Sequence, residues 1–235
     1  MDLDGVEIDA VVLDAGGVLV LPDPAAYRTA LEPFGIVPDD EACHRAAFAG
    51  TREIDRLAAL GGKTPSWREV DTVVARSLGI PDEHIEAAIE ALAWVFEQDF
   101  VPLPDATLTL ARLEASGHPF AVVSNANGRI AAVLEGHGVC STDGTGAPKA
   151  VVVVDSTVVG IEKPEPGIFA FALDVLGVPP ERCVYIGDTV HFDVDGARAA
   201  GLVPIHLDPY ALCPDDDHHH AASLAAAVEL LGVPA

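Results

Sequence analysis

The sequence predicts an α/β protein in which a doubly wound parallel sheet carries an inserted all-helical domain. Two observations predict the sheet: five short runs are apolar without alternation, and helical patterns separate them. Strands of this kind are buried on both faces, as in parallel sheets that are covered by helices. A third observation predicts the insert, because residues 22–100 contain no good strand pattern and are punctuated by Gly and Pro.

The predicted strands are rich in Val and Ile and are too short for typical helices. They cover residues 8–14, 118–125, 150–156, 182–188 and 202–208. Helical patterns lie before, between and after the later strands, at residues 106–117, 127–138, 165–177, 193–201 and 221–232. This order predicts that each strand returns to the same sheet through a helix.

The insert is expected to consist of four or five helices. Their patterns cover residues 25–33, 39–49, 52–60, 66–78 and 82–98. We therefore expect the sheet-bearing core to comprise residues 1–21 and 101–235, and the helical domain to comprise residues 22–100. An all-helical block between the first strand and the remaining strands is typical of a cap over the sheet's active edge.

Charge and composition exclude several classes of partner. The 235-residue chain has a formal net charge of −24, which argues against binding to nucleic acid or to an anionic membrane surface. The four cysteines are far apart and form no CxxC pair, which favours reduced thiols and a cytoplasmic location. The N-terminus lacks the pattern of a signal peptide, and no apolar run approaches the length of a membrane span.

Polar side chains follow three of the predicted strands, where ligands bind in open parallel sheets. Asp14 ends the first strand, Ser124 and Asn125 end the second, and Asp188 ends the fourth. Asp193 lies five residues beyond Asp188. Lys163 precedes another predicted helix, in the segment EKPEP. We therefore expect carboxylates, a hydroxyl and an ammonium group at one rim of the sheet.

This set of groups is suited to phosphoryl transfer. A carboxylate such as Asp14 can attack phosphorus, and Ser124 with main-chain amides can bind the phosphate oxygens. Lys163 can offset negative charge on both the nucleophile and the phosphate. Magnesium prefers oxygen ligands, which Asp14 and Asp188 can supply, with Asp193 as a direct or water-mediated third.

Four segments together resemble the four motifs of the haloacid dehalogenase superfamily. They are LDAGGVL, VVSNANG, the lysine of EKPEP, and YIGDTVHFD, and they cover nearly the whole chain in order. The resemblance implies a Rossmann-like core with an inserted helical cap, the arrangement of the helical-cap subgroup. It also implies an aspartyl-enzyme intermediate on Asp14, bound Mg²⁺ and a small phosphorylated substrate. The resemblance leaves the substrate's identity and the oligomeric state open.

The implied site residues fall into three groups. The catalytic residues are Asp14, Ser124 and Lys163. The residues that bind substrate phosphate are Ala15, Gly16, Ser124, Asn125 and Lys163. The metal ligands are Asp14, Gly16 through its carbonyl, Asp188 and Asp193.

The sequence departs from the family pattern at Gly16. Phosphatases of the family usually carry an aspartate there, which protonates the leaving group and then activates water. The Gly16 carbonyl is retained for metal binding, but the general acid/base is lost. Such a group typically contributes roughly 10²- to 10⁴-fold in rate.

This departure keeps three functions in view. The first is a magnesium-dependent hydrolase for a phosphorylated metabolite. The second is a metal-independent 2-haloacid dehalogenase, which needs no proton for its leaving group, or a phosphonate hydrolase, which uses a cap lysine such as Lys63. The third is a protein of low or no activity that binds a phosphorylated ligand.

One further segment invites a metal-binding interpretation. The run DDDHHH at residues 215–220 brings three acids and three imidazoles together. The spacing alone gives no tetrahedral set, so the sequence favours a solvated loop before the last helix.

Overall fold

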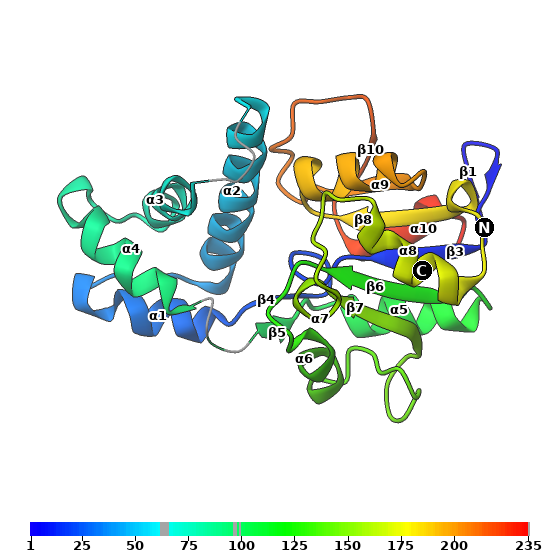
Figure 1. Cartoon of the computed structure of the whole chain (residues 1–235). Coiled ribbons are helices and arrows are strands. Elements are labelled where there is room, and N and C mark those ends of the chain that lie inside the picture. Colours follow the sequence, from blue (N-terminus) through cyan, green and yellow to red (C-terminus); the bar gives the residue numbers. More distant parts are fainter. Residues whose placement is uncertain (62–65, 96–97, 99, 235) are drawn as a thin grey trace. The chain divides into compact units, whose positions relative to one another are not determined.

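The fold class predicted from the sequence is confirmed by a computed structural model, which describes residues 1–61, 66–95, 98 and 100–234. Six strands form one parallel sheet in the order β10-β9-β8-β3-β6-β7 (Figure 1). Their bounds are β3 Ala10–Leu13, β6 Phe120–Ser124, β7 Ala150–Asp155, β8 Cys183–Gly187, β9 Val203–Leu207 and β10 His219–Ala221. The first five lie within the predicted runs, whereas β10 was not predicted.

Helices cover both faces of this sheet, which is why the central strands are apolar throughout (Figure 1). On one face, α8 (Gly167–Leu176) and α9 (Asp195–Ala199) pack against alternate residues such as Ala10 and Val12. On the other face, α5 (Ala106–Ala115) and α10 (Leu224–Leu230) pack together. The remaining elements beside β7 are α6 (Ile130–Gly136) and α7 (Ser156–Val159).

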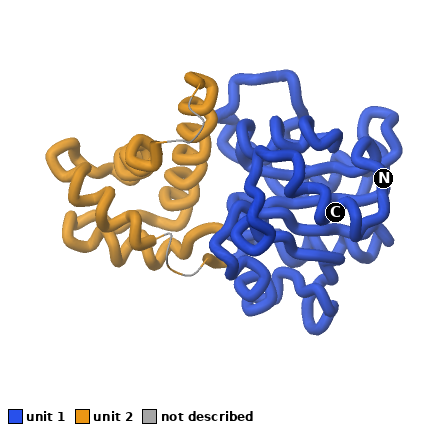
Figure 2. The backbone as a smooth tube through the Cα atoms, in the orientation of Figure 1, with its two compact units in different colours: residues 1–20, 102–235 blue, residues 21–101 orange. Residues whose placement is uncertain are grey.

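The chain divides into two compact units, residues 1–20 with 102–235 and residues 21–101 (Figure 2). It passes from one unit to the other within β4 (Val20–Pro22) and returns within β5 (Phe100–Pro102). These two strands form a two-stranded sheet. At the N-terminus, β1 (Asp2–Leu3) and β2 (Val6–Glu7) form a short antiparallel pair. Each unit therefore has its own secondary structure and core.

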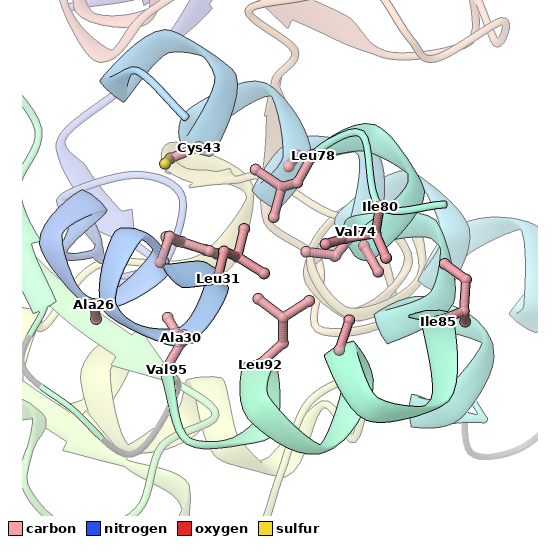
Figure 3. Packing of buried hydrophobic residues seen from close by; sticks show 14 residues of the cluster. Ala26, Ala30, Leu31, Cys43, Val74, Leu78, Ile80, Ile85, Leu92 and Val95 are labelled. Carbon is pink, nitrogen blue, oxygen red and sulfur yellow. The ribbon is translucent and has the colours of Figure 1, made fainter. Parts of the chain in front are cut away.

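Between β4 and β5, the described regular structure of the second unit consists of helices. Its helices are α1 Pro24–Leu31, α2 Asp40–Ala59, α3 Trp67–Ser77 and α4 Ile85–Ala93, with 3₁₀ turns at Glu32–Phe34 and Asp82–His84. Side chains including Leu31, Val74 and Leu92 point into a shared interior (Figure 3). Apolar residues recurring at helical spacing form this core, as expected for helices packed on one another.

The sequence-based division of α2 into two helices is wrong. We expected a break between residues 49 and 52, but α2 is continuous from Asp40 to Ala59 and Gly50 lies in its interior. A Cβ atom on Gly50 would lie 2.8 Å from Cγ2 of Val74 and 3.4 Å from Cγ1 of Val70, both in α3. Gly50 therefore permits the close approach of two helices and does not end one.

Among the described residues, no helix combines the length and the apolar character that crossing a membrane requires.

Candidate active site

Asp14 lies directly after the central strand β3, at the carboxyl edge of the sheet. Its main-chain amide donates to the carbonyl of Ile186 in the neighbouring strand (2.8 Å), which fixes the residue to the sheet. Oδ1 accepts from the amide of Ala15 (2.7 Å) and lies 3.0 Å from Nζ of Lys163. Oδ2 accepts from no described residue, so the buried carboxylate keeps capacity for a ligand.

The turn after Asp14 is shaped by two glycines with different roles. Gly17 has a φ of +68°, and a Cβ atom there would overlap the carboxylate of Asp188. A Cβ atom on Gly16 would meet nothing within 4 Å. Within the described chain, neither the amide nor the carbonyl of Gly16 has a hydrogen-bond partner. The turn thus brings Asp188 against Gly17 and leaves the N–H and the carbonyl of Gly16 available.

Lys163 is a fully buried cation at the centre of the site. Its ammonium group donates to Asp193 Oδ1 (2.7 Å) and to the Tyr185 hydroxyl (2.9 Å), and it forms an ion pair with Asp14 Oδ1 (3.0 Å). An ammonium group has three hydrogens, and it makes three polar contacts here. Lys163 therefore links the two carboxylates and is held in a single geometry.

Asp193 is brought to this lysine by a π-helical turn, η5 (Val190–Val194). Its Oδ2 accepts from the amides of Asp188 and Thr189 (3.1 and 2.9 Å) and from the Thr189 hydroxyl (2.7 Å). Its Oδ1 accepts from Lys163. Both oxygens of Asp193 therefore accept hydrogen bonds, which favours the water-mediated form of the metal contact expected for this residue.

The electrostatics of these groups follow from burial and from Lys163. Burial opposes the charge of Lys163, but Asp14 and Asp193 outweigh it and raise the lysine pKa above its ordinary value of 10.5. Burial raises the pKa of Asp14, and Lys163 opposes that shift. Burial also opposes ionisation of Asp193, but Lys163 and Thr189 outweigh it and lower the pKa below 3.8. The lysine and Asp193 therefore form a stable ion pair.

Ser124 and Asn125 follow β6 and differ in their contacts. The Ser124 hydroxyl is buried but makes no hydrogen bond to any residue that the structure describes, so it can bind a ligand. The Asn125 side chain accepts from the Lys163 amide (2.7 Å) and donates to the Lys163 carbonyl (3.0 Å). These contacts hold Lys163 in place, and the expected contact between Asn125 and a phosphate group stays a prediction.

Three carboxylates of this site form a group that fits a hard divalent cation. Asp14, Asp188 and Asp193 each offer an oxygen, and these oxygens lie within 4.8 Å of one another. The Gly16 carbonyl, without a partner in the described chain, adds another oxygen on the same turn. An all-oxygen donor set suits Mg²⁺, which also retains several waters.

Sequence reasoning missed two residues that shape this site. Tyr185 lies in an apolar strand and was taken only as part of it, yet its hydroxyl lies 3.0 Å from Asp193 Oδ1 and 3.1 Å from the Val123 carbonyl. Asp155 ends β7 and accepts from the amides of Gly128 and Thr157, which orders the loop after Ser124. Both side chains are buried and polar, a property that only the tertiary structure reveals.

Two further sequence expectations have different outcomes. The cap lysine considered for a phosphonate hydrolase, Lys63, lies outside the described residues. The solvated loop expected at residues 215–220 is wrong for its last two residues, because residues 219–221 form strand β10. His218 and His220 lie beside His206 and Cys213 in a second group of ligating side chains.

A comparison with models of protein families shows which family the chain belongs to. The family model described as haloacid dehalogenase-like hydrolase matches residues 8–201. The chain belongs to this family. The match spans β3 through α9 and so includes Asp14, Ser124, Lys163 and Asp188. The family resemblance inferred from the four sequence motifs is therefore confirmed.

Curated relatives of this hydrolase include several phosphatases. Over 55 residues it is 47% identical to glyceraldehyde 3-phosphate phosphatase of Methanopyrus kandleri, covering 23% of this chain and 24% of the relative. Over 65 residues it is 43% identical to phosphoserine phosphatase of Thermus thermophilus, covering 28% and 26%. The chain thus spans about a quarter of each. Haloacid dehalogenase-like hydrolase domain-containing protein 3 of Mus musculus is 28% identical over 188 residues, 75% of this chain and 71% of the relative.

Solved structures with the same fold include both phosphatases and dehalogenases. A HAD phosphatase from Thermococcus onnurineus has a TM-score of 0.58 at 21% identity, over 97% of this chain and 99% of the other. L-2-haloacid dehalogenase from Xanthobacter autotrophicus has a TM-score of 0.56 at 20% identity, over 97% and 100%. At these identities the similarity establishes the fold and leaves the reaction to the residues of the site.

Proposed function

We propose that this hydrolase is a magnesium-dependent phosphatase that forms an aspartyl-phosphate on Asp14. The single observation that carries the proposal is the buried Lys163, which bridges Asp14 and Asp193 beside a third acid, Asp188. Phosphatase relatives that match short parts of this chain support the same reaction class. A small phosphorylated metabolite is the substrate that this chemistry requires.

In the proposed first step, a carboxylate oxygen of Asp14 attacks phosphorus and the bond to the leaving-group oxygen breaks. Lys163 holds Asp14 Oδ1 and neutralises charge on the nucleophile. The Ser124 hydroxyl and the Gly16 amide, which have no partner in the described chain, donate to the phosphate oxygens. In the second step, water attacks the phosphorus of the aspartyl-phosphate, releasing inorganic phosphate and restoring the Asp14 carboxylate.

The residues that would hold Mg²⁺ are Asp14, Asp188 and the carbonyl of Gly16, with Asp193 acting through water. When bound, the ion offsets the repulsion between the Asp14 carboxylate and the dianionic phosphate. Asp193 meanwhile orients Lys163 and the amides of residues 188 and 189.

Gly16 restricts the substrates that can react quickly. No side chain at this position can protonate the departing oxygen, so a leaving group that is stable as an anion is favoured. Acyl and anomeric phosphates have better leaving groups than simple alkyl phosphates. We therefore propose the former as the substrate class.

The helical unit is proposed to act as the cap that selects the substrate. It is inserted between the strand that carries Asp14 and the strand that carries Ser124, as in helical-cap members of the family. The cap, and not the core, would then set which leaving group is accepted.

The proposal is tested with purified protein, excess Mg²⁺ and paired substrates. Acetyl phosphate should be hydrolysed faster than a primary alkyl phosphate, and both activities should disappear in Asp14→Asn or with a chelator. In ¹⁸O-labelled water, a single turnover should place the label in inorganic phosphate. Equal rates for the two phosphates would contradict the argument from Gly16.

The same assays separate the alternatives. Dehalogenation of a 2-haloacid that persists in chelator would overturn the phosphatase proposal. In that reaction water attacks the ester carbonyl, so the ¹⁸O label would enter the carboxylate of Asp14. Absence of turnover with every substrate, together with binding of phosphate analogues, would indicate a ligand-binding protein.

A further inference from the structure

A second group of ligating side chains, distinct from the carboxylate site, lies at the edge of the sheet that strands β9 and β10 form. Strands β9 and β10 are parallel neighbours, and His206 and His220 occupy partnered positions in them. Successive side chains in a strand point to opposite faces. His218 and His220 therefore share a face, whereas His219 points away and lies 3.5 Å from Asp4. Strand alternation thus selects two of the three consecutive histidines.

Each of the three clustered histidines has one ring nitrogen bonded to an oxygen. His206 Nε2 lies 3.1 Å from the Asp188 carbonyl, and His220 Nε2 lies 3.0 Å from the Asp215 carbonyl. His218 Nδ1 lies 2.7 Å from Asp217 Oδ1. Metal-binding histidines characteristically donate their second ring nitrogen to a carbonyl or carboxylate in this way.

These contacts fix the tautomers, because carbonyl and carboxylate oxygens only accept hydrogen bonds. The bonded nitrogen of each ring carries the hydrogen, and in the neutral ring the other nitrogen presents a lone pair. His206 Nδ1 and His218 Nε2 face each other at 3.1 Å, so two lone pairs meet at hydrogen-bond distance. A bound cation resolves this conflict.

A thiol completes the set. Cys213 Sγ lies 3.9 Å from His218 Nε2, and the Cys213 amide donates to Asp208 Oδ2 (2.9 Å). Asp208 also accepts from the amide of Leu212, so the loop is folded back toward the end of β9. The four ligand atoms, from His206, Cys213, His218 and His220, all lie within 4.8 Å of one another.

Polar contacts outside the group hold it in place. Arg198 in α9 contacts both the carboxylate (3.1 Å) and the carbonyl (2.5 Å) of Asp217, whose carboxylate in turn holds His218. The His218 side chain is completely buried. These contacts hold the His218 ring in one orientation before any ion binds. The carboxylate of Asp217 would also offset part of the charge of a bound divalent ion.

We propose that His206, Cys213, His218 and His220 bind one Zn²⁺ ion in a tetrahedral structural site. Three imidazole nitrogens and one thiolate are a donor set that Zn²⁺ favours and Mg²⁺ does not. Bonds of about 2.0–2.3 Å in a tetrahedron bring ligand atoms to separations of about 3.3–3.8 Å, a small contraction of the present group. Four protein ligands leave no open position, so the ion fastens residues 208–218 to β9 and β10.

The proposal is independent of the proposed phosphatase activity and is tested with Zn²⁺ alone. The full chain is titrated with Zn²⁺ in excess Mg²⁺, and the bound metal is counted by elemental analysis. We expect one Zn²⁺ per chain in the wild type, in Asp14→Asn and in His219→Ala. Binding should weaken about 10- to 100-fold in Asp217→Asn, and further in Cys213→Ser or His218→Ala.

Two measurements on the wild-type chain test the proposal without relying on the folding of any variant. Co²⁺ in place of Zn²⁺ should give a thiolate-to-metal absorption band. Zn²⁺ should also slow alkylation of Cys213, the one half-exposed cysteine among four whose other members are buried. The proposal is overturned if no Zn²⁺ binds in excess Mg²⁺, if Zn²⁺ leaves Cys213 alkylation unchanged, or if Asp14→Asn abolishes binding while Cys213→Ser retains it.

Discussion

Gly16 and Gly17 are adjacent in the turn after Asp14, but a side chain would have different consequences at each. A Cβ atom at Gly17 would overlap Asp188 and require a strained positive φ, whereas a Cβ atom at Gly16 would meet nothing within 4 Å. Gly16 is therefore the position in this turn at which one substitution can introduce the missing acid of the proposed phosphatase.

We predict that Gly16→Asp raises kcat/KM for primary alkyl phosphates by about 10²- to 10⁴-fold, because the new carboxyl group can protonate the leaving oxygen. Acyl phosphates, which need no such proton, should gain far less. Steady-state kinetics on both substrates measures the difference. Gly16→Asn is the matched control, since it fills the same space without a titratable proton. Equal gains in both variants would show that general acid catalysis is not the cause.

Lys163 illustrates how one buried charge determines the stability of two others. Removing it leaves Asp14 and Asp193 as buried carboxylates without a cation. We predict that Lys163→Met lowers the free energy of unfolding at pH 7 by about 3–5 kcal/mol, as for other broken buried pairs. Urea denaturation measures the change, and Lys149→Met, at an exposed lysine, should change stability by less than about 0.5 kcal/mol.

The effect of pH on this variant has a definite sign. In the wild type, the Asp193 pKa is lowered, so its stabilising contribution is complete above 3.8 and is lost as pH falls through the folded value. Without Lys163, burial dominates and raises the pKa of both carboxyl groups. Acidification from pH 7 toward pH 4 should therefore narrow the stability gap between variant and wild type. A gap that widens on acidification would contradict the assigned ion pair.

At the scale of elements, strands were more predictable than helix boundaries. The central strands β3, β6 and β8 are buried throughout and β7 and β9 in part, so all five carry apolar runs that are visible in the sequence. Strand β10 escaped detection because an edge strand containing His219 and His220 lacks that signal. Strand β10 pairs with residues 205–207 of β9, which are distant in the sequence, and this pairing places His206 beside His220.

The break expected in α2 failed for a similar reason. Glycine ordinarily disfavours a helix interior, so Gly50 gives no signal in the sequence that the helix continues. Glycine is needed at position 50 because a Cβ atom there would overlap Val74 in another helix, and the periodicity of the sequence contains no information about that contact. In the same way, the candidate site residues at strand ends could be nominated from sequence, whereas the Tyr185 hydroxyl gains its partners only through tertiary structure.

We predict that Gly50→Ala destabilises the helical unit by up to about 2 kcal/mol. The substitution gains about 1 kcal/mol in helix propensity, but overpacking against buried Val74 costs about 1–3 kcal/mol. In a Val74→Ala background, which removes the clash, the same substitution should become stabilising. Gly136→Ala in α6 is the control, because its Cβ meets nothing within 4 Å. Urea denaturation of the two single variants and the double variant measures the free energies of unfolding. If Gly50→Ala stabilises the protein both with Val74 and with Ala at position 74, the close packing of α2 on α3 is contradicted.

At the scale of the whole molecule, the charge of −24 bears directly on a phosphorylated substrate. Such a substrate is an anion, and a strongly acidic protein repels it during encounter. The cations of the site, Lys163 and the proposed Mg²⁺, act only at short range because they are surrounded by carboxylates. The net field should therefore slow association, in contrast to enzymes that steer anions with basic surfaces.

We predict that kcat/KM of the proposed phosphatase rises with ionic strength at constant free Mg²⁺. Raising salt from about 0.01 to 0.15 M shortens the screening length from about 30 to 8 Å and so weakens the long-range repulsion. The increase of kcat/KM with ionic strength should be steeper for a more negative substrate. A phosphate ester whose leaving group is neutral is therefore the control for an ester whose leaving group is anionic. A kcat/KM that falls with salt, most steeply for the more negative ester, would mean that local positive charge outweighs the net charge and governs capture.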